Sequence, residues 1–305
     1  MNAAAPNALG NLSAELAGVV AAHARSVVYV DAHPRRDASG IVWDERHVVT
    51  VAHAIDREDD IELLLADDGR ARATLVGLDR STDIAVLASD TPLAPAPRGD
   101  AASLAVGNLV LALAREEDGA LGASFGIVSS LDGAWRTWRG GAVERFVRPD
   151  VNAYAGFSGG PLVSATGGVV GMNTWALSRR NAITLPLVTL ERVATELATR
   201  GRIARGWLGV ALQSVRLPDA LRAAHDIAQN AGAIVVGVAA GGPAERAGMT
   251  LGDVLLAIGD ETTEDSDDVQ RALGAGAGTS RPVRLLRAGE LRELAVTFGE
   301  RPHDE

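Results

Sequence analysis

Three polar residues in separate parts of the sequence have the types needed for nucleophilic catalysis. Ser158 lies in GFSGGPL, His53 lies in HVVTVAHAI, and Asp83 lies in STDIAVL. A serine hydroxyl is a weak nucleophile unless a base takes its proton, and an imidazole oriented by a carboxylate is such a base. We therefore predict acyl-transfer chemistry in which Ser158 attacks, His53 transfers the proton and Asp83 orients His53.

The glycines around Ser158 suit a turn that stabilises a developing negative charge. Gly156, two positions before the serine, accepts backbone conformations that residues with a Cβ resist. In such a turn, backbone N–H groups can point at the oxygen that becomes negative during acyl transfer. We predict an oxyanion hole at Gly156, Phe157 and Ser158, with the N–H groups of Gly156 and Ser158 as donors.

Each of these signals has a purely structural explanation when it is taken alone. Ser-Gly-Gly is common in turns, a histidine can simply end a strand, and Asp83 can cap the start of one. Asp56 and Asp79 are alternative acids in the same region. The three segments in this order favour the catalytic interpretation, and of the three acids only Asp83 directly precedes an apolar strand within the matching motif.

The elements that must position these residues are mainly β-strands. Residues 26–187 form short segments rich in Val, Ile, Leu and Thr, separated by Gly, Pro, Asp and Ser. Closely spaced strands without alternating helices predict an antiparallel barrel or sandwich. The next segment, LVTLERVATELATR, has apolar residues at helical spacing and Gly201 after its last turn, which predicts one helix.

The pattern changes from residue 206 onward. Strands alternate there with a short helix that begins at Pro243 and with the helix SDDVQRALG, for which we expect Ser266 as the N-cap. This mixture predicts a compact α+β module. We divide the chain into an N-terminal arm or helix (1–25), a first domain (26–200), a linker (201–206) and a C-terminal domain (207–302).

Composition narrows the classes of function. The net charge of -10 argues against a nucleic-acid partner. The absence of cysteine excludes disulfides and thiolate sites, and the scattered histidines predict no metal and no other cofactor. The N-terminus lacks a basic start followed by an apolar run, so we expect no signal peptide, and no apolar stretch could span a membrane. The chain as written would be cytoplasmic, although its composition leaves the compartment open.

The motifs also resemble a known family. VVTVAHAI, STDIAVL and GFSGGPL, in this order, resemble the three triad segments of HtrA-type (Deg) serine proteases. WLGV and GGPAERAGMTLGDVLLAIGD resemble the PDZ domain of the same proteins. The resemblance covers nearly the whole chain and implies a mainly β fold. This fold is a chymotrypsin-like pair of six-stranded barrels with the triad between them, followed by an α+β PDZ domain.

The resemblance also implies a function. Such proteins are serine endopeptidases that cleave unfolded or damaged polypeptides without ATP, and their PDZ domain binds C-terminal or exposed peptides. The PDZ binding loop here would be Trp207, Leu208, Gly209 and Val210. The substrate pocket would involve Asn152, Tyr154, Ile183, Thr184 and Leu185. Relatives are usually exported. A homo-oligomer is compatible with the sequence, but the N-terminal arm lacks the aromatic residues with which many members form trimers.

Two segments depart from the family pattern. Phe157 stands where the family usually has asparagine, and residues 115–122 replace a turn rich in glycine and proline. These departures keep two alternatives open: a non-cleaving chaperone or adaptor that holds peptides, and a resting enzyme that PDZ ligands switch on. Trp135 and Trp138 could form a substrate-contacting loop or pack against a barrel.

Overall fold

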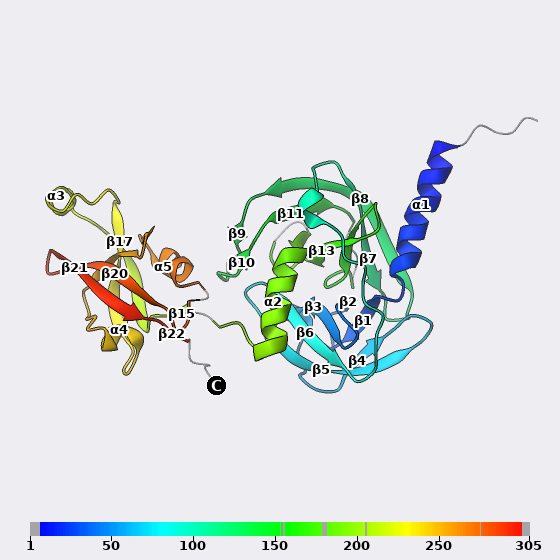
Figure 1. The fold of residues 1–305 in the computed structure, drawn as a ribbon, viewed down its shortest axis with the longest axis horizontal. Coiled ribbons are helices and arrows are strands. Elements are labelled where there is room, and N and C mark those ends of the chain that lie inside the picture. The colour runs from blue at the N-terminus through cyan, green and yellow to red at the C-terminus, as the bar shows by residue number, and fades with distance from the viewer. Residues whose placement is uncertain are drawn as a thin grey trace, which may run out of the picture. The chain divides into compact units, whose positions relative to one another are not determined.

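The computed structural model describes residues 7–152, 154, 156–178, 182–204, 206–274 and 276–300. The chain divides into two compact units, and the boundary between them in the sequence lies between residues 203 and 204 (Figure 1). Each unit is described by itself. The first unit is built mainly from β-strands and the second from strands and helices, as predicted. The finer boundaries predicted at residues 25, 200 and 206 stay predictions.

The first six strands close into an antiparallel barrel. They follow the order β1-β2-β3-β6-β5-β4 around the barrel. Their apolar side chains fill its interior, with Val28, Val48 and Leu87 fully buried. The strands are β1 (Val27–Asp31), β2 (Ala38–Val42), β3 (His47–Val51), β4 (Ile61–Leu64), β5 (Arg70–Asp79) and β6 (Ile84–Ser89).

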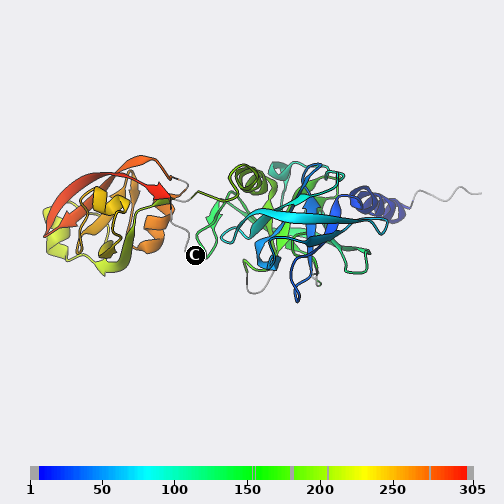
Figure 2. The same cartoon turned by 90° about the horizontal axis from the view of Figure 1, so that it is seen from below.

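A second antiparallel barrel of six strands follows, with the order β11-β14-β13-β12-β7-β8 (Figures 1 and 2). One apolar cluster contains buried residues of both barrels, among them Val86 and Leu113, so the barrels share a core. The strands are β7 (Leu109–Arg115), β8 (Leu121–Asp132), β11 (Phe146–Asp150), β12 (Pro161–Ser164), β13 (Val169–Thr174) and β14 (Ile183–Pro186).

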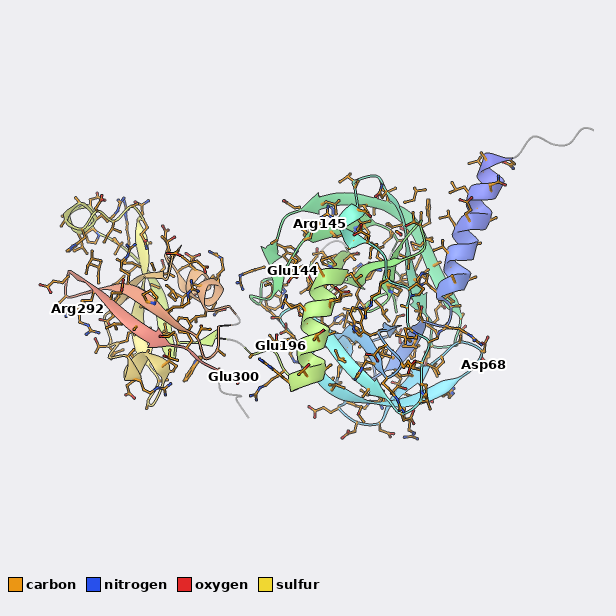
Figure 3. The ribbon with its side chains drawn as sticks, viewed as in Figure 1. Asp68, Glu144, Arg145, Glu196, Arg292 and Glu300 are labelled. Carbon is orange, nitrogen blue, oxygen red and sulfur yellow. The ribbon has the colours of Figure 1, made fainter. Side chains whose placement is uncertain are left out.

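Short elements join the barrel strands. A hairpin of β9 (Trp135–Arg136) and β10 (Ala142–Val143) lies between β8 and β11 in sequence, and 3-10 turns form at η1 (Ala52–Ala54) and η2 (Ala101–Ser103). Helix α2 (Leu187–Arg200) confirms the predicted helix, and Gly201 ends it with a φ of 70°. Arg192 of α2 donates to the carboxylate of Glu144 at 2.5 Å, which ties the helix to the segment between β10 and β11. Figure 3 shows Glu144 beside α2.

Helix α1 (Ala8–His23) precedes the first barrel. Its N-terminal half is exposed, and Leu16, Val19 and Val20 pack partly against the shared core. His23, at the end of α1, is fully buried, and its Nε2 lies 3.1 Å from the carbonyl oxygen of Gly167. Nδ1 of His23 is buried without a hydrogen-bond partner in the described structure. Burial lowers the pKa of His23 from its ordinary value of 6.5, against the opposing effect of the Gly167 carbonyl.

The second unit is an α+β module around one sheet. Its strand order is β16-β17-β18-β20-β21, so β16 lies at an edge, and β15 pairs with β22. The elements are β15 (Gly206–Trp207), β16 (Val210–Arg216), α3 (Asp219–Ala224), β17 (Ala231–Val238), α4 (Pro243–Arg246), β18 (Val254–Ile258), β19 (Glu261–Thr262), α5 (Ser266–Leu273), β20 (Ser280–Arg287), β21 (Glu290–Thr297) and β22 (Gly299–Glu300).

The N-cap of α5 differs from the prediction. Asp265, not Ser266, holds that position, because its carboxylate accepts hydrogen bonds from the N–H groups of Asp267 and Asp268. A carboxylate at this position also interacts favourably with the positive end of the helix dipole. Ser266 is therefore the first residue of the helix.

The buried imidazole of His23 predicts a loss of stability in mild acid. Well above pH 6.5, its ordinary pKa, His23 is neutral in both the folded and the unfolded chain. Below that pH the unfolded chain binds the proton first, so the free energy of unfolding falls as the pH decreases. We expect this decrease between pH 7.5 and 5.5 in chemical denaturation followed by tryptophan fluorescence, which reports chiefly on the first unit because four of the five tryptophans lie there.

The control for this prediction is a second histidine. His23→Leu should flatten the pH dependence in that range, and His33→Leu, at a partly exposed position, should leave it as in the wild type. An unchanged slope in His23→Leu would contradict the assignment.

Candidate active site

The structure brings His53 and Asp83 into direct contact. His53 lies in the 3-10 turn η1 directly after β3, and Asp83 lies directly before β6, which pairs with β3. Nδ1 of His53 is 2.9 Å from Oδ2 and 3.1 Å from Oδ1 of Asp83. The backbone N–H of His53 also donates to Oδ1 at 2.9 Å. The imidazole is therefore held through both its ring and its backbone.

The carboxylate of Asp83 is buried but has several donors. Only 3% of the residue is exposed. The hydroxyl of Thr174, at the end of β13, donates to Oδ2 at 2.5 Å. Thr174 belongs to the second barrel, so this bond connects the two barrels at the site. Burying a carboxylate is costly unless donors replace water, and the contacts from His53 and Thr174 meet that need.

The turn before Asp83 fixes its position. The carboxylate of Asp79 accepts hydrogen bonds from the hydroxyls of Ser81 and Thr82 and from their backbone N–H groups. Asp83 itself has a φ of 61°, in the left-handed region. Asp79 therefore holds the turn that leads to Asp83, and Asp56 is exposed. Of the three acids weighed from the sequence, Asp83 is the one at the imidazole.

Ser158 lies in a turn that hydrogen bonds attach to both barrels. Its carbonyl oxygen accepts from the N–H of Ser39 on β2 at 2.8 Å, and the N–H of Gly159 donates to Asn173 on β13 at 2.8 Å. Gly159 has a φ of 84°, and a Cβ there would lie 2.0 Å from the carbonyl oxygen of Ser39. Glycine is thus required at Gly159 by its conformation and by the close approach of β2.

Ser39 is a residue of the site that the sequence analysis did not identify. Its buried hydroxyl donates to the carbonyl oxygen of Gly156 at 2.8 Å and accepts from the N–H of Arg115 at 2.9 Å. Thr50 on β3 donates to the Ser39 carbonyl at 2.7 Å. No motif spacing marks Ser39 or Thr174, because each acts across the barrel interface, far from the serine or acid in sequence.

The residues predicted for the oxyanion hole adopt different environments. Gly156 has a φ of 87° and its carbonyl oxygen faces Ser39. The N–H of Phe157 donates to the carbonyl oxygen of Tyr154 at 3.3 Å, within the turn. The Phe157 side chain is only 2% exposed and belongs to the core of the second barrel. Phe157, which departs from the family pattern, therefore anchors the serine turn in the core of the second barrel.

The loop at residues 115–122 is held by a buried arginine. Arg115 ends β7, and Gly119 turns the chain back into β8 with a φ of 86°. The Arg115 guanidinium donates to the carbonyl oxygens of Val27, Gly119 and Ala24. Burial lowers the pKa of this guanidinium, against the opposing charge of Asp67. The loop thus has its own anchor in place of the expected glycine-proline turn.

The residues predicted for the substrate pocket fall into two groups. Asn152 is exposed and the Tyr154 side chain is 63% exposed. Ile183, Thr184 and Leu185 on β14 are buried, and the Thr184 hydroxyl donates to Asn173 at 2.8 Å. The side chains of Thr184 and Leu185 are thus both buried, on opposite faces of β14. Their role in a pocket stays a prediction.

Two clefts of opposite charge adjoin these residues. We call the first the arginine cleft. It is lined by Arg36, His53, Arg80, Asp83, Trp138, Arg139, Ala176 and Leu177. The second, the acidic cleft, has a volume of about 720 Å³ and is lined by Tyr29, Asp37, Glu116, Glu117, Asp118, Tyr154 and Gly156. One cleft therefore contains the imidazole, and the other contains the first glycine of the serine turn.

The two tryptophans left open by the sequence behave differently. Trp135 packs edge-on against Phe146, with ring centroids 5.6 Å apart. Trp138 is 71% exposed, and the Arg139 guanidinium lies 4.4 Å from its ring centroid. Packing thus explains Trp135, whereas Trp138 lines the arginine cleft.

In the second unit, the predicted peptide-binding loop leads directly into the edge strand β16. Gly209 has a φ of 79°, and the carbonyl oxygens of Leu208 and Gly209 accept from the N–H groups of Ala244 and Ala239. The Leu208 side chain is buried in the core of this unit. A Cβ on Gly209 would lie 3.3 Å from the Trp207 ring and from Pro243. The loop is thus closely packed from behind.

The described part of the chain contains neither a cluster of metal ligands nor a membrane-spanning helix. No group of three or more His, Asp or Glu side chains there could hold a metal ion. No helix among those residues has both the length and the apolar character needed to cross a bilayer.

Comparison with known proteins identifies both units. A family model described as a trypsin-like peptidase domain matches residues 38–172, and one described as a PDZ domain matches residues 234–287. The chain is 32% identical over 272 residues to a probable periplasmic serine endoprotease DegP-like of Halomonas elongata and to another of Pseudomonas putida strain W619. These alignments cover 87% of this chain and 56% of each relative, so the chain spans about half the length of the curated relatives it matches.

Solved structures agree with this match. A serine endoprotease from Yersinia pestis is 26% identical, with a TM-score of 0.73 over 94% of this chain and 98% of that chain. The HtrA-type protease AlgW with a decapeptide is 26% identical, with a TM-score of 0.74 over 95% of this chain and 99% of that chain. With two six-stranded barrels followed by a region that matches a PDZ domain, the chain is similar to HtrA-type proteases over nearly its whole length.

Proposed function

We propose that this chain is a serine endopeptidase that cleaves unfolded or damaged polypeptides through an acyl-enzyme. The observation that carries this proposal is the contact between His53 Nδ1 and the buried carboxylate of Asp83, in the barrel that adjoins the Ser158 turn. Ser158 is the nucleophile, His53 the general base and Asp83 the residue that orients the base. The N–H groups of Gly156 and Ser158 are the proposed donors to the oxyanion.

The contacts of Asp83 determine which nitrogen of His53 can act as the base. Because Nδ1 faces a carboxylate, it carries the hydrogen and donates it to Asp83. Nε2 then keeps its lone pair for the proton of the Ser158 hydroxyl. As the hydroxyl oxygen bonds to the substrate carbonyl carbon, its proton moves to Nε2, and the imidazolium later gives that proton to the leaving amine.

We propose that the PDZ domain binds peptides by adding a strand to β16. This strand lies at the edge of its sheet, directly after the loop of Trp207, Leu208 and Gly209. An extended peptide can pair with such an edge, and successive backbone N–H groups in the loop can receive its terminal carboxylate. Helix α5 packs near β16 and would form the other wall of the groove.

The proposal also covers the cellular location of the protein and its self-association. The curated relatives are named periplasmic, so we propose an extracytoplasmic location in place of the cytoplasmic one predicted from the N-terminus. A chain without cysteine can fold there without disulfide chemistry. Leu9 and Leu12 are exposed apolar residues of α1 and support self-association, without favouring a trimer over other homo-oligomers.

Removing the nucleophile tests the activity. Ser158→Ala should lower kcat for casein hydrolysis by about 10⁴-fold or more, because the covalent route is lost. The matched control is Ser164→Ala, since the Ser164 hydroxyl lies 2.7 Å from the Thr166 hydroxyl and the residue lines neither cleft. That variant should retain wild-type activity and should still react with a fluorophosphonate probe at Ser158.

The same experiment separates the proposal from a non-cleaving adaptor. Equal casein hydrolysis by the wild type and Ser158→Ala would refute the catalytic role of Ser158. An adaptor would bind unfolded casein but show no hydrolysis and no labelling of Ser158, even with a saturating PDZ peptide.

The peptide-binding loop can be tested at Gly209. Gly209→Ala places a Cβ in a left-handed conformation against Trp207 and Pro243, at a cost of about 1 to 2 kcal/mol. We expect about tenfold weaker binding of a labelled decapeptide with an apolar C-terminal residue and a free carboxylate, measured by fluorescence anisotropy. The control, Gly252→Ala, has a similar φ of 86° but open space around the new Cβ.

Two results would count against this loop. One is wild-type affinity in Gly209→Ala. The other is equal affinity of the wild type for the free and the amidated peptide, which would remove the role of the carboxylate.

The anchoring role of Phe157 can be measured as stability. Phe157→Ala removes a buried ring and should lower the free energy of unfolding of the first unit by about 3 to 5 kcal/mol. Phe125→Ala is the matched control, because Phe125 lies on β8 of the same barrel but is 51% exposed, and its loss should cost less than about 1 kcal/mol. Denaturation followed by tryptophan fluorescence gives both values, and equal losses would show that Phe157 does not anchor the turn.

A further inference from the structure

The arginine cleft holds three cations without a counter-charge. Arg36, Arg80 and Arg139 line it together with His53, and all three arginines are exposed. Within the described part of the chain, none of the three has an ion pair with a carboxylate, although many other arginines of this protein do. The remaining acid of the cleft, Asp83, is buried and engaged with His53 and Thr174.

The three arginines are held in position by the fold. The hydroxyl of Thr137, in the turn that leads from β9 to β10, donates to the carbonyl oxygen of Ser81 at 2.6 Å. A Cβ on Gly141 would lie 2.5 Å from the same oxygen, so the hairpin and the Ser81 turn are in close contact. Arg80 lies in this turn and Arg139 in this hairpin, so the contact keeps both on the cleft.

Local contacts also hold the side chains of Arg36 and Arg139. The Arg36 guanidinium donates to the carbonyl oxygen of His53 at 2.5 Å. The Arg139 guanidinium stacks on the Trp138 ring, which restricts its motion, and the residue is exposed to solvent. Clustered guanidinium groups repel one another, and a carboxylate that enters between them is stabilised by charge-assisted hydrogen bonds.

The acidic cleft gives the two ends of the site opposite charge. Asp37 lines the acidic cleft and its chain neighbour Arg36 lines the arginine cleft, so the loop between β1 and β2 separates the two. A hydrogen bond from the Tyr29 hydroxyl at 3.0 Å holds the Asp37 carboxylate, and burial together with Asp37 raises the pKa of Tyr29. A negatively charged side chain is therefore attracted at the imidazole end of the site and repelled at the Gly156 end.

We propose that the arginine cleft is a substrate subsite that selects an acidic side chain, Asp or Glu, close to the cleaved bond and on one side of it only. This inference rests on the proposed endopeptidase function. It assigns Arg80, Arg139 and Arg36 as specificity residues that bind the carboxylate of the substrate. The preference weakens as ionic strength rises, because the pairs are exposed to solvent.

The experiment uses the full chain and two steps. A library of proteome-derived peptides is first digested, and the cleavage positions are read by mass spectrometry. Acidic residues should be enriched at one or two positions on a single side of the cleaved bond. A fluorogenic peptide is then made with Glu or with Gln at the enriched position, and the ratio of the two kcat/KM values is measured.

Substitution of the cleft arginines should change the ratio of kcat/KM for the Glu peptide to kcat/KM for the Gln peptide. The wild type should cleave the Glu peptide about fivefold or more faster than the Gln peptide in low salt, as expected for several exposed charge pairs. The double variant R80Q/R139Q should bring the ratio close to one. Arg98→Gln is the matched control, because Arg98 also stacks on a tryptophan, Trp43, at 4.1 Å, but lies outside both clefts. It should keep the wild-type ratio.

The outcomes separate this inference from the function on which it rests. Cleavage without acidic enrichment, or an unchanged ratio in R80Q/R139Q, would overturn the subsite and leave the endopeptidase intact. No cleavage of any peptide, together with no fluorophosphonate labelling of Ser158, would overturn the proposed function itself.

Discussion

The site depends on hydrogen bonds that cross from one barrel to the other. The acid and the imidazole belong to the first barrel and the serine turn to the second. Thr174 reaches Asp83 from β13, and Ser39 reaches the serine turn from β2. Because both bonds are buried, breaking either leaves a polar group without a partner, which costs more than the net value of the bond. The two barrels thus hold His53, Asp83 and the serine turn in one arrangement.

The architecture could be predicted because short patterns along the sequence determine the strands and helix α2. Apolar strands without intervening helices predicted the barrels, the spacing of Leu190, Val193 and Leu197 predicted α2, and Gly201 marked its end. The contact between His53 and Asp83 follows from the same logic, since both residues lie at the same end of paired strands. Sequence motifs of this kind are short, and they describe residues that act through neighbours along one strand.

Most of the contacts that could not be predicted join residues that are far apart in the sequence. Ser39 and Thr174 contribute through hydroxyls that meet partners on another barrel, and an isolated Ser or Thr in a strand has no distinguishing pattern. The N-cap of α5 was misassigned by one residue because Asp265 and Ser266 are both good caps, and only the backbone conformation decides between them. Buried β14 residues likewise gave no sign of which face they occupy.

The double attachment of the serine turn has a consequence for damaged molecules. Ser39 supports that turn from one barrel while Gly159 and Asn173 hold it from the other, so neither barrel alone retains the arrangement. A molecule that has lost the structure of either half therefore has no assembled centre. If the chain is the proposed endopeptidase, partial denaturation by heat or acid abolishes its activity, and a damaged molecule does not cleave neighbouring proteins.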